Sequence, residues 1–582
     1  MSVLLKIRCN EDDALLFWSI AAPIPRCRGF AIERKKTPAD GPLVQDFLPN
    51  RIGFDTTGHA PIDANGAALM KASTEWPFQT FSWTDHDANT GDTVQYRVVP
   101  VLREATGALK PLNEAASEWS DPVKLGIDKN ATYQPFFNRG FVISQFMARY
   151  LKEKGLSLAQ FKDQIGNPGA QLHEHSIRNF LSGDLRLAML EQLDIALNTS
   201  GEIFAALYEL DDDELISALT ALKGRAHVVL SNGSITKADG ETTAQARMRD
   251  QNNRARSLLL GAGVDVEAKN RFISPGALGH NKFLVRTDKD RQPLVAWTGS
   301  TNWTKTGLCT QVNNGLLIAD KEVSAIYLKQ WHRLREAKSE FPASLVTANG
   351  TPSGLDVDAT GNARAIVRFT RTKDGGDLKA LEDAVDGATD GILFLMFQPG
   401  AKGALGDVLT RIADKNLYLR GVVSTLPTAK ETEDAVEVTL VDGSIQKTTQ
   451  YRIVQPAGVA NPLAFFAAEV TRSQFLSQVG FAIIHSKVLV IDPFTDHPTV
   501  ITGSHNFSST ASKSNDENYI IIRGDRALAE AYAVNVFGAY AHYRWRSFIA
   551  ENNATVGVLH DDDAWQEPKL KAQARDLRFF GV

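Results

Sequence analysis

Two short stretches of this chain repeat the same residue types in the same order. "HNKFLVR" begins at His280 and "HSKVLVI" begins at His485, and each is followed by Thr-Gly-Ser-x-Asn. His280 lies 19 positions before Gly299, and His485 lies 18 positions before Gly503. The next shared asparagine follows that glycine by 15 positions in both copies. The duplication predicts two copies of one structural unit, because an accidental match would not preserve every spacing.

Segments of strand and helix character surround each copy in the same order. In the first copy, "EIFAALYEL" leads into "DDDELISALTAL", whose acidic start suits a helix N-terminus, and then into "AHVVLSNG". In the second copy, "DGILFLMFQPG" leads into a helix-like stretch at 404–415 and then into "LYLRGVVST". This alternation predicts two α/β lobes with mixed, mainly parallel sheets and helices on their faces. The loop-like stretch at 348–363 is expected to link them.

The beginning of the chain has a different character. Residues 1–127 contain short strand-like runs separated by turn-rich stretches, which is typical of an all-β sandwich. Trp18 in "LLFWSI", Tyr96 in "VQYRVVPV" and the closing "SEWSDPVKL" resemble a fibronectin type III domain. The alternative is another β-sandwich with Trp18 in its core. Because this module carries no catalytic constellation, we expect it to bind a protein or surface partner.

These patterns predict a multidomain fold class, in which an N-terminal all-β sandwich precedes two α/β lobes related by an internal pseudo-twofold repeat. A chain of 582 residues is long enough for three domains of ordinary size. The expected divisions are a sandwich at 1–127, a first lobe at 128–350 and a second lobe at 351–582.

Composition sets further limits. Apolar residues make up 43% of the chain and charged residues 23%, and the net charge of -5 excludes a wholly basic nucleic-acid coat. The three cysteines exclude a disulfide framework, although a single Cys9–Cys27 bridge stays open and Cys309 is left over. No apolar run approaches the roughly 18 residues of a membrane span, and the N-terminus has no signal-peptide character. We therefore expect a cytoplasmic protein, with signal-independent export as the alternative.

The repeated stretches carry groups suited to phosphate chemistry. Residues i and i+2 of a strand share a face, so His280 would project with Lys282, and His485 with Lys487. If the lobes pack about a pseudo-twofold axis, two imidazoles and two ammonium groups converge on one cleft. Lysines there would hold the non-bridging oxygens of a phosphodiester while one histidine attacks phosphorus and the other protonates the leaving oxygen.

The paired motifs "HNK…TGSTNWT" and "HSKVLVID…TGSHNFSSTASKSNDENYIII" resemble those of the phospholipase D superfamily. The resemblance implies metal-independent phosphodiester cleavage through a covalent phosphohistidine, by hydrolysis or by transfer to another alcohol. It assigns catalysis to His280, Lys282, His485 and Lys487. The groups expected beside the phosphate, or supporting those that are, are Ser300, Asn302, Asp492, Ser504, Asn506 and Glu517.

The two copies differ at two positions. Asp492 follows Lys487 by five residues, as the family pattern asks, whereas the first copy has Thr287 there and Asp288 one position later. The second copy also has Glu517 where the first has Asn313. A carboxylate beside an imidazole favours its protonated form and an amide cannot. Our hypothesis is that Glu517 keeps His485 protonated as the general acid, which leaves His280 as the nucleophile.

The substrate stays open between a phospholipid head group and a nucleic acid. The Gly-Ser form of the motifs looks closer to the nuclease-like branch of the superfamily, but no Lys/Arg-rich run with aromatics marks a nucleic-acid groove. The alternative from a different functional class is a non-catalytic binding scaffold, and the intact His-x-Lys pairs argue against it.

Two further stretches are ambiguous. An insert in the second copy contains a hairpin-like stretch at 435–454 and a segment at 461–478 with Phe465, Phe466 and Phe475. These rings either line the cleft or form the core of a short helical subdomain. "HEH" at 173–175 lacks a third ligand at metal spacing and is expected to be a solvated loop.

Overall fold

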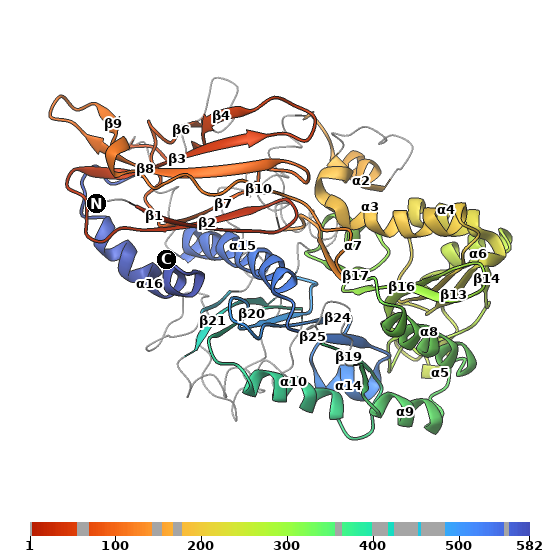
Figure 1. The fold of residues 1–582 in the computed structure, drawn as a ribbon. Helices are drawn as coiled ribbons and strands as arrows, with labels where there is room; N and C mark the ends of the chain where they lie inside the picture. Colours follow the sequence, from red (N-terminus) through yellow and green to blue (C-terminus); the bar gives the residue numbers. More distant parts are fainter. Residues whose placement is uncertain are drawn as a thin grey trace. The chain divides into compact units, whose positions relative to one another are not determined.

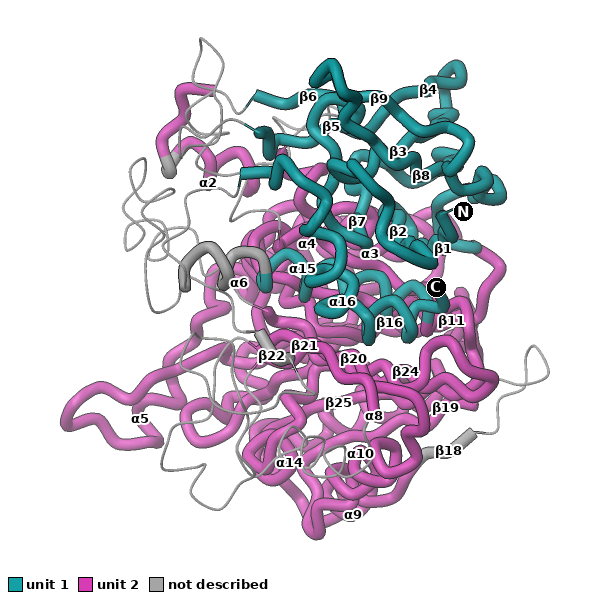
Figure 2. The backbone as a smooth tube through the Cα atoms, turned by 90° about the vertical axis from the view of Figure 1, so that its left-hand side faces the viewer, with its two compact units in different colours: residues 1–128, 530–582 teal, residues 129–529 magenta. Residues whose placement is uncertain are grey.

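The structure is a computed structural model of the chain. It describes residues 3–54, 69–141, 154–166, 177–355, 364–397, 417–423, 452–454, 484–551 and 558–582. Several predicted segments lie outside these residues, namely 173–175, 404–415, 435–451 and 461–478. The chain forms two compact units, one made of Met1–Asp128 with Glu530–Val582 and the other of Lys129–Ala529 (Figure 2).

The strands of the first unit form two main antiparallel sheets. One sheet has the order β1 (Leu4–Cys9), β2 (Ala14–Ser19) and β7 (Ser82–Asp85). The other has the order β10 (Val123–Lys124), β8 (Thr93–Arg103), β3 (Cys27–Thr37) and β4 (Val44–Phe47), with β9 (Leu109–Pro111) beside β8. The short elements are the pair β5 (Pro49–Asn50) and β6 (Lys71–Ala72) and the 3-10 helix η1 (Asn113–Ala115). Along β8, Val94, Tyr96 and Val98 are buried while the residues between them are partly exposed, which is the alternation expected of a strand with one covered face.

The end of the chain completes the core of this same unit. The ring of Phe17 on β2 stacks on Phe580 at 4.2 Å and meets Phe537 edge-on at 5.2 Å. Phe537 lies on α15 (Arg526–Glu551) and Phe580 on α16 (Gln566–Phe580), which Figure 1 shows in blue beside β1 and β2. Residues 530–582, which the sequence analysis places in the second lobe, therefore group with the N-terminal sheets because their aromatic side chains pack against β2.

The second unit contains a seven-stranded sheet and an eight-stranded sheet. The first has the order β11 (Tyr133–Phe137), β17 (Asn314–Ile318), β16 (Pro293–Gly299), β15 (Lys282–Thr287), β12 (Ile203–Leu207), β13 (Ala226–Leu230) and β14 (Asp265–Val266). The second has the order β18 (Ser353–Leu355), β19 (Arg364–Phe369), β25 (Asn518–Arg523), β24 (Thr499–Gly503), β23 (Val488–Ile491), β20 (Gly391–Met396), β21 (Tyr418–Val423) and β22 (Arg452–Val454). From β17 to β14 and from β25 to β22, the two sheets run through equivalent strands in the same order.

The expectation of mainly parallel sheets is wrong. Among the described strands, β12 pairs in parallel with β13, β13 with β14, β20 with β21 and β21 with β22, while every other neighbouring pair in the two sheets is antiparallel. The parallel pairs of the first sheet are those joined through helices, as in β12–α4–β13–α6–β14. β15 and β16 are joined by a short turn instead, and such a connection makes the two strands antiparallel.

Ten α-helices and one 3-10 helix are described in full or in part within the second unit before α15. They are α2 (Leu158–Gly166), α3 (Ile177–Asn198), α4 (Asp213–Leu222), η3 (Lys223–Arg225), α5 (Thr243–Arg247), α6 (Asn253–Gly261), α7 (Lys305–Cys309), α8 (Lys321–Glu336), α9 (Ala343–Gly350), α10 (Gly376–Asp386) and α14 (Ser509–Ser514). The acidic stretch before α4 acts as predicted, because the carboxylate of Asp212 accepts a hydrogen bond from the amide of Leu215 at the N-terminus of the helix. Within the described residues, no helix is both long enough and apolar enough to cross a bilayer.

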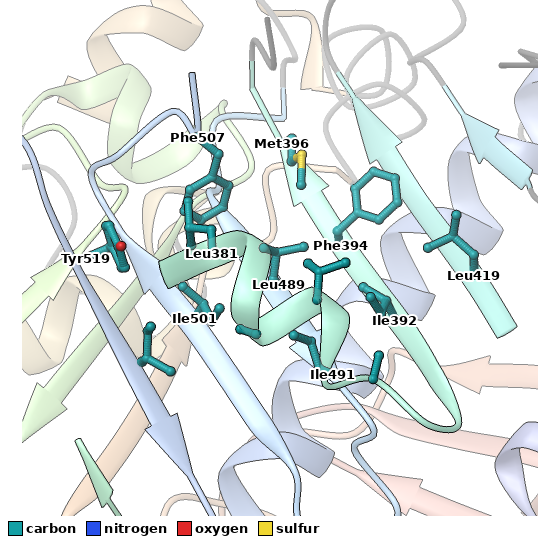
Figure 3. Packing of buried hydrophobic residues seen from close by; sticks show 14 of the residues in the cluster. Leu381, Ile392, Phe394, Met396, Leu419, Leu489, Ile491, Ile501, Phe507 and Tyr519 are labelled. Carbon is teal, nitrogen blue, oxygen red and sulfur yellow. The ribbon is translucent and has the colours of Figure 1, made fainter. Parts of the chain in front are cut away.

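A hydrophobic core fixes the strands that carry the second repeated motif. Leu381 on α10 packs against a sheet face formed by Ile392 and Phe394 of β20, Leu489 of β23 and Ile501 of β24 (Figure 3). These side chains are fully buried. At about 1.5–3 kcal/mol for each buried large apolar side chain, this packing holds β23, and with it the residues that precede β23, in one position.

Candidate active site

The two repeated histidines meet inside the second unit. The ring centroids of His280 and His485 lie 6.4 Å apart with the rings inclined at 70°, and each residue is almost fully buried. The amide of His280 donates to the carbonyl of Asp516, and the amide of His485 donates to the carbonyl of Val312. Each histidine is therefore held by the loop that precedes the strand β25 or β17 of the opposite sheet.

Each lysine is hydrogen-bonded to the backbone of the histidine two positions before it, although only Lys282 lies on a strand and the other three residues precede β15 or β23. Lys282 Nζ donates to the carbonyl oxygen of His280 at 2.8 Å, and Lys487 Nζ donates to that of His485. Both ammonium groups belong to buried residues. The site thus brings two imidazoles together with two lysine side chains, for which the sequence analysis expects the charged ammonium form.

Two aromatic residues that the sequence analysis missed flank the pairs. The ring of Tyr208 lies 4.8 Å from that of His280 and 5.0 Å from Lys282 Nζ. The ring of Phe397 lies 4.9 Å from that of His485 and 4.9 Å from Lys487 Nζ. Tyr208 directly follows β12 and Phe397 directly follows β20, so the aromatic residue closing "IFAALY" and "ILFLMF" was the available signal.

The acceptors on the two histidines are exchanged between the motif copies. Glu517 Oε2 lies 2.7 Å from His280 Nδ1, and Asn313 Oδ1 lies 2.9 Å from His485 Nδ1. The hypothesis that Glu517 pairs with His485 is therefore wrong. It assumed that each histidine uses the acceptor of its own copy, whereas each loop before β17 or β25 reaches across to the histidine of the other copy.

The hydrogen bonds around these acceptors fix the histidine tautomers. Asn313 Nδ2 donates to the carbonyl of Gly307, so its Oδ1 is the atom that accepts from His485. Glu517 accepts from Asn515 Nδ2 at 3.0 Å as well as from His280. Both histidines consequently carry hydrogen on Nδ1, and Nε2 is the atom left for chemistry in each ring.

The serines of the Gly-Ser-x-Asn motifs support these acceptors. Ser300 Oγ donates to Asn313 Oδ1 at 2.7 Å, and Ser504 Oγ donates to Glu517 Oε2 at 3.0 Å. Both serines are fully buried. The structure thus places Ser300 and Ser504 behind the histidine acceptors, where they orient Asn313 and Glu517.

The glycines of the motifs serve close strand packing. Gly299 pairs with Gly315 of β17 and has a φ of 146°. A Cβ on Gly299 would lie 2.4 Å from the carbonyl oxygen of Asn314. The absence of a side chain therefore lets β16 and β17 approach each other, which is a role the sequence analysis did not assign.

The asparagines of the motifs present polar atoms that have no partner in the described part of the chain. Asn302 Nδ2 donates to Glu209 Oε2 at 2.8 Å, while Asn302 Oδ1 is buried without a hydrogen bond. Asn506 Oδ1 is likewise buried without a partner among the described residues. A buried orphan polar atom is costly, so both positions fit contact with a ligand.

Asp492 does not join the histidines and lysines. It follows β23, whereas Lys487 precedes that strand, so the two are separated by about 15 Å of extended chain. Its carboxylate accepts hydrogen bonds from the amides of Thr389, Asp390 and Gly391 and from the Thr389 hydroxyl. Asp492 therefore fixes the start of β20.

Asp288 does not replace Asp492 in the first copy. Its carboxylate accepts from the amides of Asp290 and Gln292 within the turn between β15 and β16. Thr287 occupies the equivalent strand position and is buried, with its amide donating to the carbonyl of Glu202.

Burial dominates the electrostatics of the catalytic candidates. It lowers the pKa of His280 to about 4, with Glu517 acting in the opposite direction and Lys282 adding to the decrease. Burial also lowers the pKa of Lys282 to about 7 and holds the pKa values of His485 and Lys487 well below their ordinary values. At neutral pH the free protein therefore presents an unprotonated Nε2 on His280.

Glu517 keeps its negative charge in this environment. Its burial alone would raise its pKa, but His280 and the other nearby basic groups bring the pKa below the ordinary glutamate value. The site thus holds one fixed anion behind the ring of His280 and none behind that of His485, where the acceptor is an amide. Among the described residues, no group of three or more histidine, cysteine or acidic side chains has the arrangement of a metal site.

Comparison with known proteins places the repeated motifs in a recognised domain. A family model described as "Cardiolipin synthase, PLD-like domain" matches residues 193–335 and 405–536. The first matched segment contains the His280–Lys282 pair and the second contains the His485–Lys487 pair. The match thus covers both copies of the motif.

Curated relatives match over a shorter stretch. A protein named "Phospholipase D" from Rickettsia felis is 53% identical over 53 residues, which is 9% of this chain and 24% of the relative. The proteins of the same name from Rickettsia prowazekii and Rickettsia conorii are both 51% identical, over 55 and 53 residues. The chain spans about a quarter of the length of the curated relatives it matches.

Solved structures give distant matches. A phospholipase D family member from Salmonella typhimurium is 18% identical with a TM-score of 0.20, covering 31% of this chain and 96% of its own. The phosphatidylserine synthase of Haemophilus influenzae Rd KW20 is 12% identical with a TM-score of 0.38, covering 68% of this chain and 92% of its own. The family match shows that the chain carries a phospholipase D-like domain over residues 193–335 and 405–536.

Proposed function

We propose that the second unit is a phosphodiesterase in which both His-x-Lys pairs form one active site. The observation that carries the proposal is the exchanged pair of hydrogen bonds, Glu517 to His280 at 2.7 Å and Asn313 to His485 at 2.9 Å, around two rings 6.4 Å apart. This arrangement leaves both Nε2 atoms without a partner from these acceptors and gives the two rings different ones. Because the two histidines have different acceptors, one of them can serve as the nucleophile and the other as the acid.

In the first step, Nε2 of His280 attacks phosphorus. The Nε2–P bond forms, the P–O bond to the leaving group breaks, and the leaving oxygen takes a proton from Nε2 of His485. The positive charge that His280 gains in the phosphohistidine is offset by the carboxylate of Glu517 behind the ring. His280 thus stays the proposed nucleophile, but because Glu517 supports its charge.

In the second step, the phosphohistidine is resolved. Water attacks phosphorus, the O–P bond forms, the Nε2–P bond breaks, and Nε2 of His485 takes a proton from the water. An alcohol in place of water gives transfer instead of hydrolysis by the same bonds. His485 is proposed as the acid because its amide partner does not stabilise the imidazolium and so leaves its proton easier to transfer.

The lysines act on the phosphate oxygens. A bound phosphodiester supplies the negative charge that the free site lacks around Lys282, Lys487 and His485, and it therefore favours their protonated forms. Asn302 and Asn506 stay proposed as groups beside the phosphate, but their orphan atoms are acceptor oxygens, so we propose that these atoms accept from a protonated lysine or a substrate hydroxyl and not from the phosphate oxygens. Asp492 is proposed as a structural residue.

The substrate class is proposed as a phospholipid head group or a nucleic-acid phosphodiester. The names of the Rickettsia relatives favour the phospholipid, and the Gly-Ser form of both motifs favours the nucleic acid.

We also propose that the two lobes are related by a pseudo-twofold repeat, supported by the matching strand orders. Residues 1–127 are proposed as a fibronectin type III-like sandwich, supported by the order β1–β2–β7 and β10–β8–β3–β4 and by the contact of Trp18 with Phe30.

The test combines activity with trapping of the intermediate. Purified protein is incubated with bis(p-nitrophenyl) phosphate, phospholipid vesicles, DNA and RNA, each with chelator, beside His280→Ala and His485→Ala. We expect cleavage of the aryl diester and of one natural class, and loss of both in the variants. Alkaline quenching of a His485→Asn reaction with the aryl diester, followed by peptide mass spectrometry, should find the adduct on His280. An adduct on residue 485 in the wild type, or cleavage that survives both alanine variants, contradicts the proposal.

A further inference from the structure

A second carboxylate, Glu209, stands beside the lysine of the first motif. Its Oε2 accepts from Asn302 Nδ2 at 2.8 Å and its Oε1 accepts from Gln251 Nε2 at 3.3 Å. The residue is partly exposed, unlike Glu517. Burial raises the pKa of Glu209 and Lys282 acts in the opposite direction, while the carboxylate of Glu209 in turn favours the charged form of Lys282. Glu209 therefore reaches the phosphate-binding side of the site through both Lys282 and Asn302.

This carboxylate makes the two halves of the site unequal in charge. Glu209 acts on Lys282, whereas Glu517 acts on both Lys282 and Lys487. Glu209 is the second residue after β12, and the second residue after β20 in the sequence is Gln398. The mechanism described above uses Glu517 and leaves Glu209 without a role.

The diester substrate and the monoester product differ in charge, so the carboxylate of Glu209 affects them unequally. Hydrolysis converts a phosphodiester, which carries one negative charge, and water into an alcohol and a phosphomonoester. The monoester gives up a proton with a pKa of about 6 and then carries two negative charges at neutral pH. With both lysines protonated and both glutamates ionised, the formal charges of the two lysines, Glu209 and Glu517 sum to zero. Without Glu209 the sum would be one positive charge.

Resting on the proposed phosphodiesterase function, we propose that Glu209 is a specificity-determining residue that makes the site prefer a monoanionic diester over a dianionic monoester. Its carboxylate repels each negative charge of the bound ligand, so the monoester is penalised twice and the diester once. The same repulsion speeds release of the monoester product. For a charge on the order of 8 Å away, partly screened by solvent, the difference between the two ligands amounts to about tenfold in affinity.

Two matched probes test this preference, dimethyl phosphate as the diester and methyl phosphate as the monoester. Their inhibition constants against bis(p-nitrophenyl) phosphate are measured for the full chain and for Glu209→Gln, an amide of the same size. At pH about 7.5, where a monoester is dianionic, the affinity ratio should shift by about tenfold toward methyl phosphate. At pH about 5, where both probes are monoanionic, the shift should vanish, which a merely structural effect of the substitution would not produce.

Two further variants keep the test decisive. Asp213→Asn removes the same formal charge at the start of α4, where the carboxylate pairs with Arg254 and Lys305, and should leave the ratio unchanged. Gln251→Glu adds a carboxylate next to Glu209, so the affinity ratio should shift toward dimethyl phosphate. If Glu209→Gln does not fold, Gln251→Glu serves as the test in its place. A wild-type ratio in the folded variant at pH about 7.5, with diester cleavage intact, overturns the role of Glu209 alone. Wild-type protein that neither cleaves the diester nor binds either probe overturns the proposed function and this inference together.

Discussion

Glu517 Oε2 lies 2.7 Å from Nδ1 of His280, although the two residues stand 237 positions apart in the chain. The corresponding acceptor on His485 is the amide of Asn313. The two histidines are therefore chemically distinct in spite of their identical motifs. Four predictions follow from this arrangement and from the residues that build it.

Replacing the carboxylate behind His280 should remove most of the activity. In Glu517→Gln the side chain keeps its size, but the charge that offsets the phosphohistidine is gone. We expect kcat to fall by up to about 10⁴-fold, the loss found when a carboxylate that orients a catalytic histidine becomes an amide. The measurement is turnover of bis(p-nitrophenyl) phosphate, with thermal unfolding as a check of folding. A decrease of less than tenfold in a folded variant would show that Glu517 does not support the nucleophile.

Anion binding should weaken as pH rises through neutrality. Burial depresses the pKa of Lys282 from 10.5 to about 7, so in the free protein its ammonium is present below that pH and lost above it. A bound phosphodiester favours the ammonium form. The affinity for dimethyl phosphate should therefore decrease above pH 7, with at least about one proton taken up per anion bound, since Lys487 and His485 also gain protons. Calorimetry in buffers of different ionisation enthalpy measures the proton uptake. In Lys282→Arg, whose guanidinium stays charged, the decrease should be smaller, and an unchanged pH profile would assign it to another group.

Loss of Asp492 should reduce stability and leave the chemistry intact. Its carboxylate accepts three backbone amides and a hydroxyl at the start of β20. Asp492→Ala leaves those donors without their partner, and we expect the free energy of unfolding to fall by at least about 2 kcal/mol. Urea denaturation gives that value, and kcat per folded molecule should match the wild type. Asp288→Ala, in the turn of the first copy, is the matched control and should cost less than about 1 kcal/mol. A large loss of kcat in folded Asp492→Ala would show that this residue supports the catalytic groups, as the sequence analysis expects.

A methyl group on Gly299 should disrupt the strand pair that carries the first motif. The added Cβ would lie 2.4 Å from the carbonyl oxygen of Asn314, and the φ of 146° disfavours any side chain. We expect Gly299→Ala to lower the free energy of unfolding by about 3 kcal/mol or more, or to prevent folding. Gly107→Ala is the control, because its φ is also positive but no atom lies within 4 Å of the added Cβ. If both variants lose only about 1 kcal/mol, the tight approach of β16 to β17 is not required.

Part of the fold was readable because its signals are local. Acidic residues before α4 predicted the start of that helix, and the alternating burial along β8 follows from the pattern of its side chains. The relative direction of neighbouring strands has no local sequence signal within the strands themselves. β15 and β16 are antiparallel because the short turn at 288–292 joins them, a connection that is visible in the sequence but that the expectation of mainly parallel sheets did not take into account. The packing of Phe580 on Phe17 joins residues 563 positions apart and left no mark in either segment.

For the candidate site too, some features could be predicted from the sequence and others could not. The sequence by itself determined the chemical set, because each motif supplies one histidine and one lysine two positions later. Their position side by side does not follow from strand alternation, since only Lys282 lies on a strand and the other three residues precede β15 or β23. Only the tertiary structure decided which acceptor each histidine receives. That choice depends on which loop passes behind which ring, and hydrogen bonds between residues 172 and 237 positions apart are set by the packing of the two sheets and not by any feature of either motif.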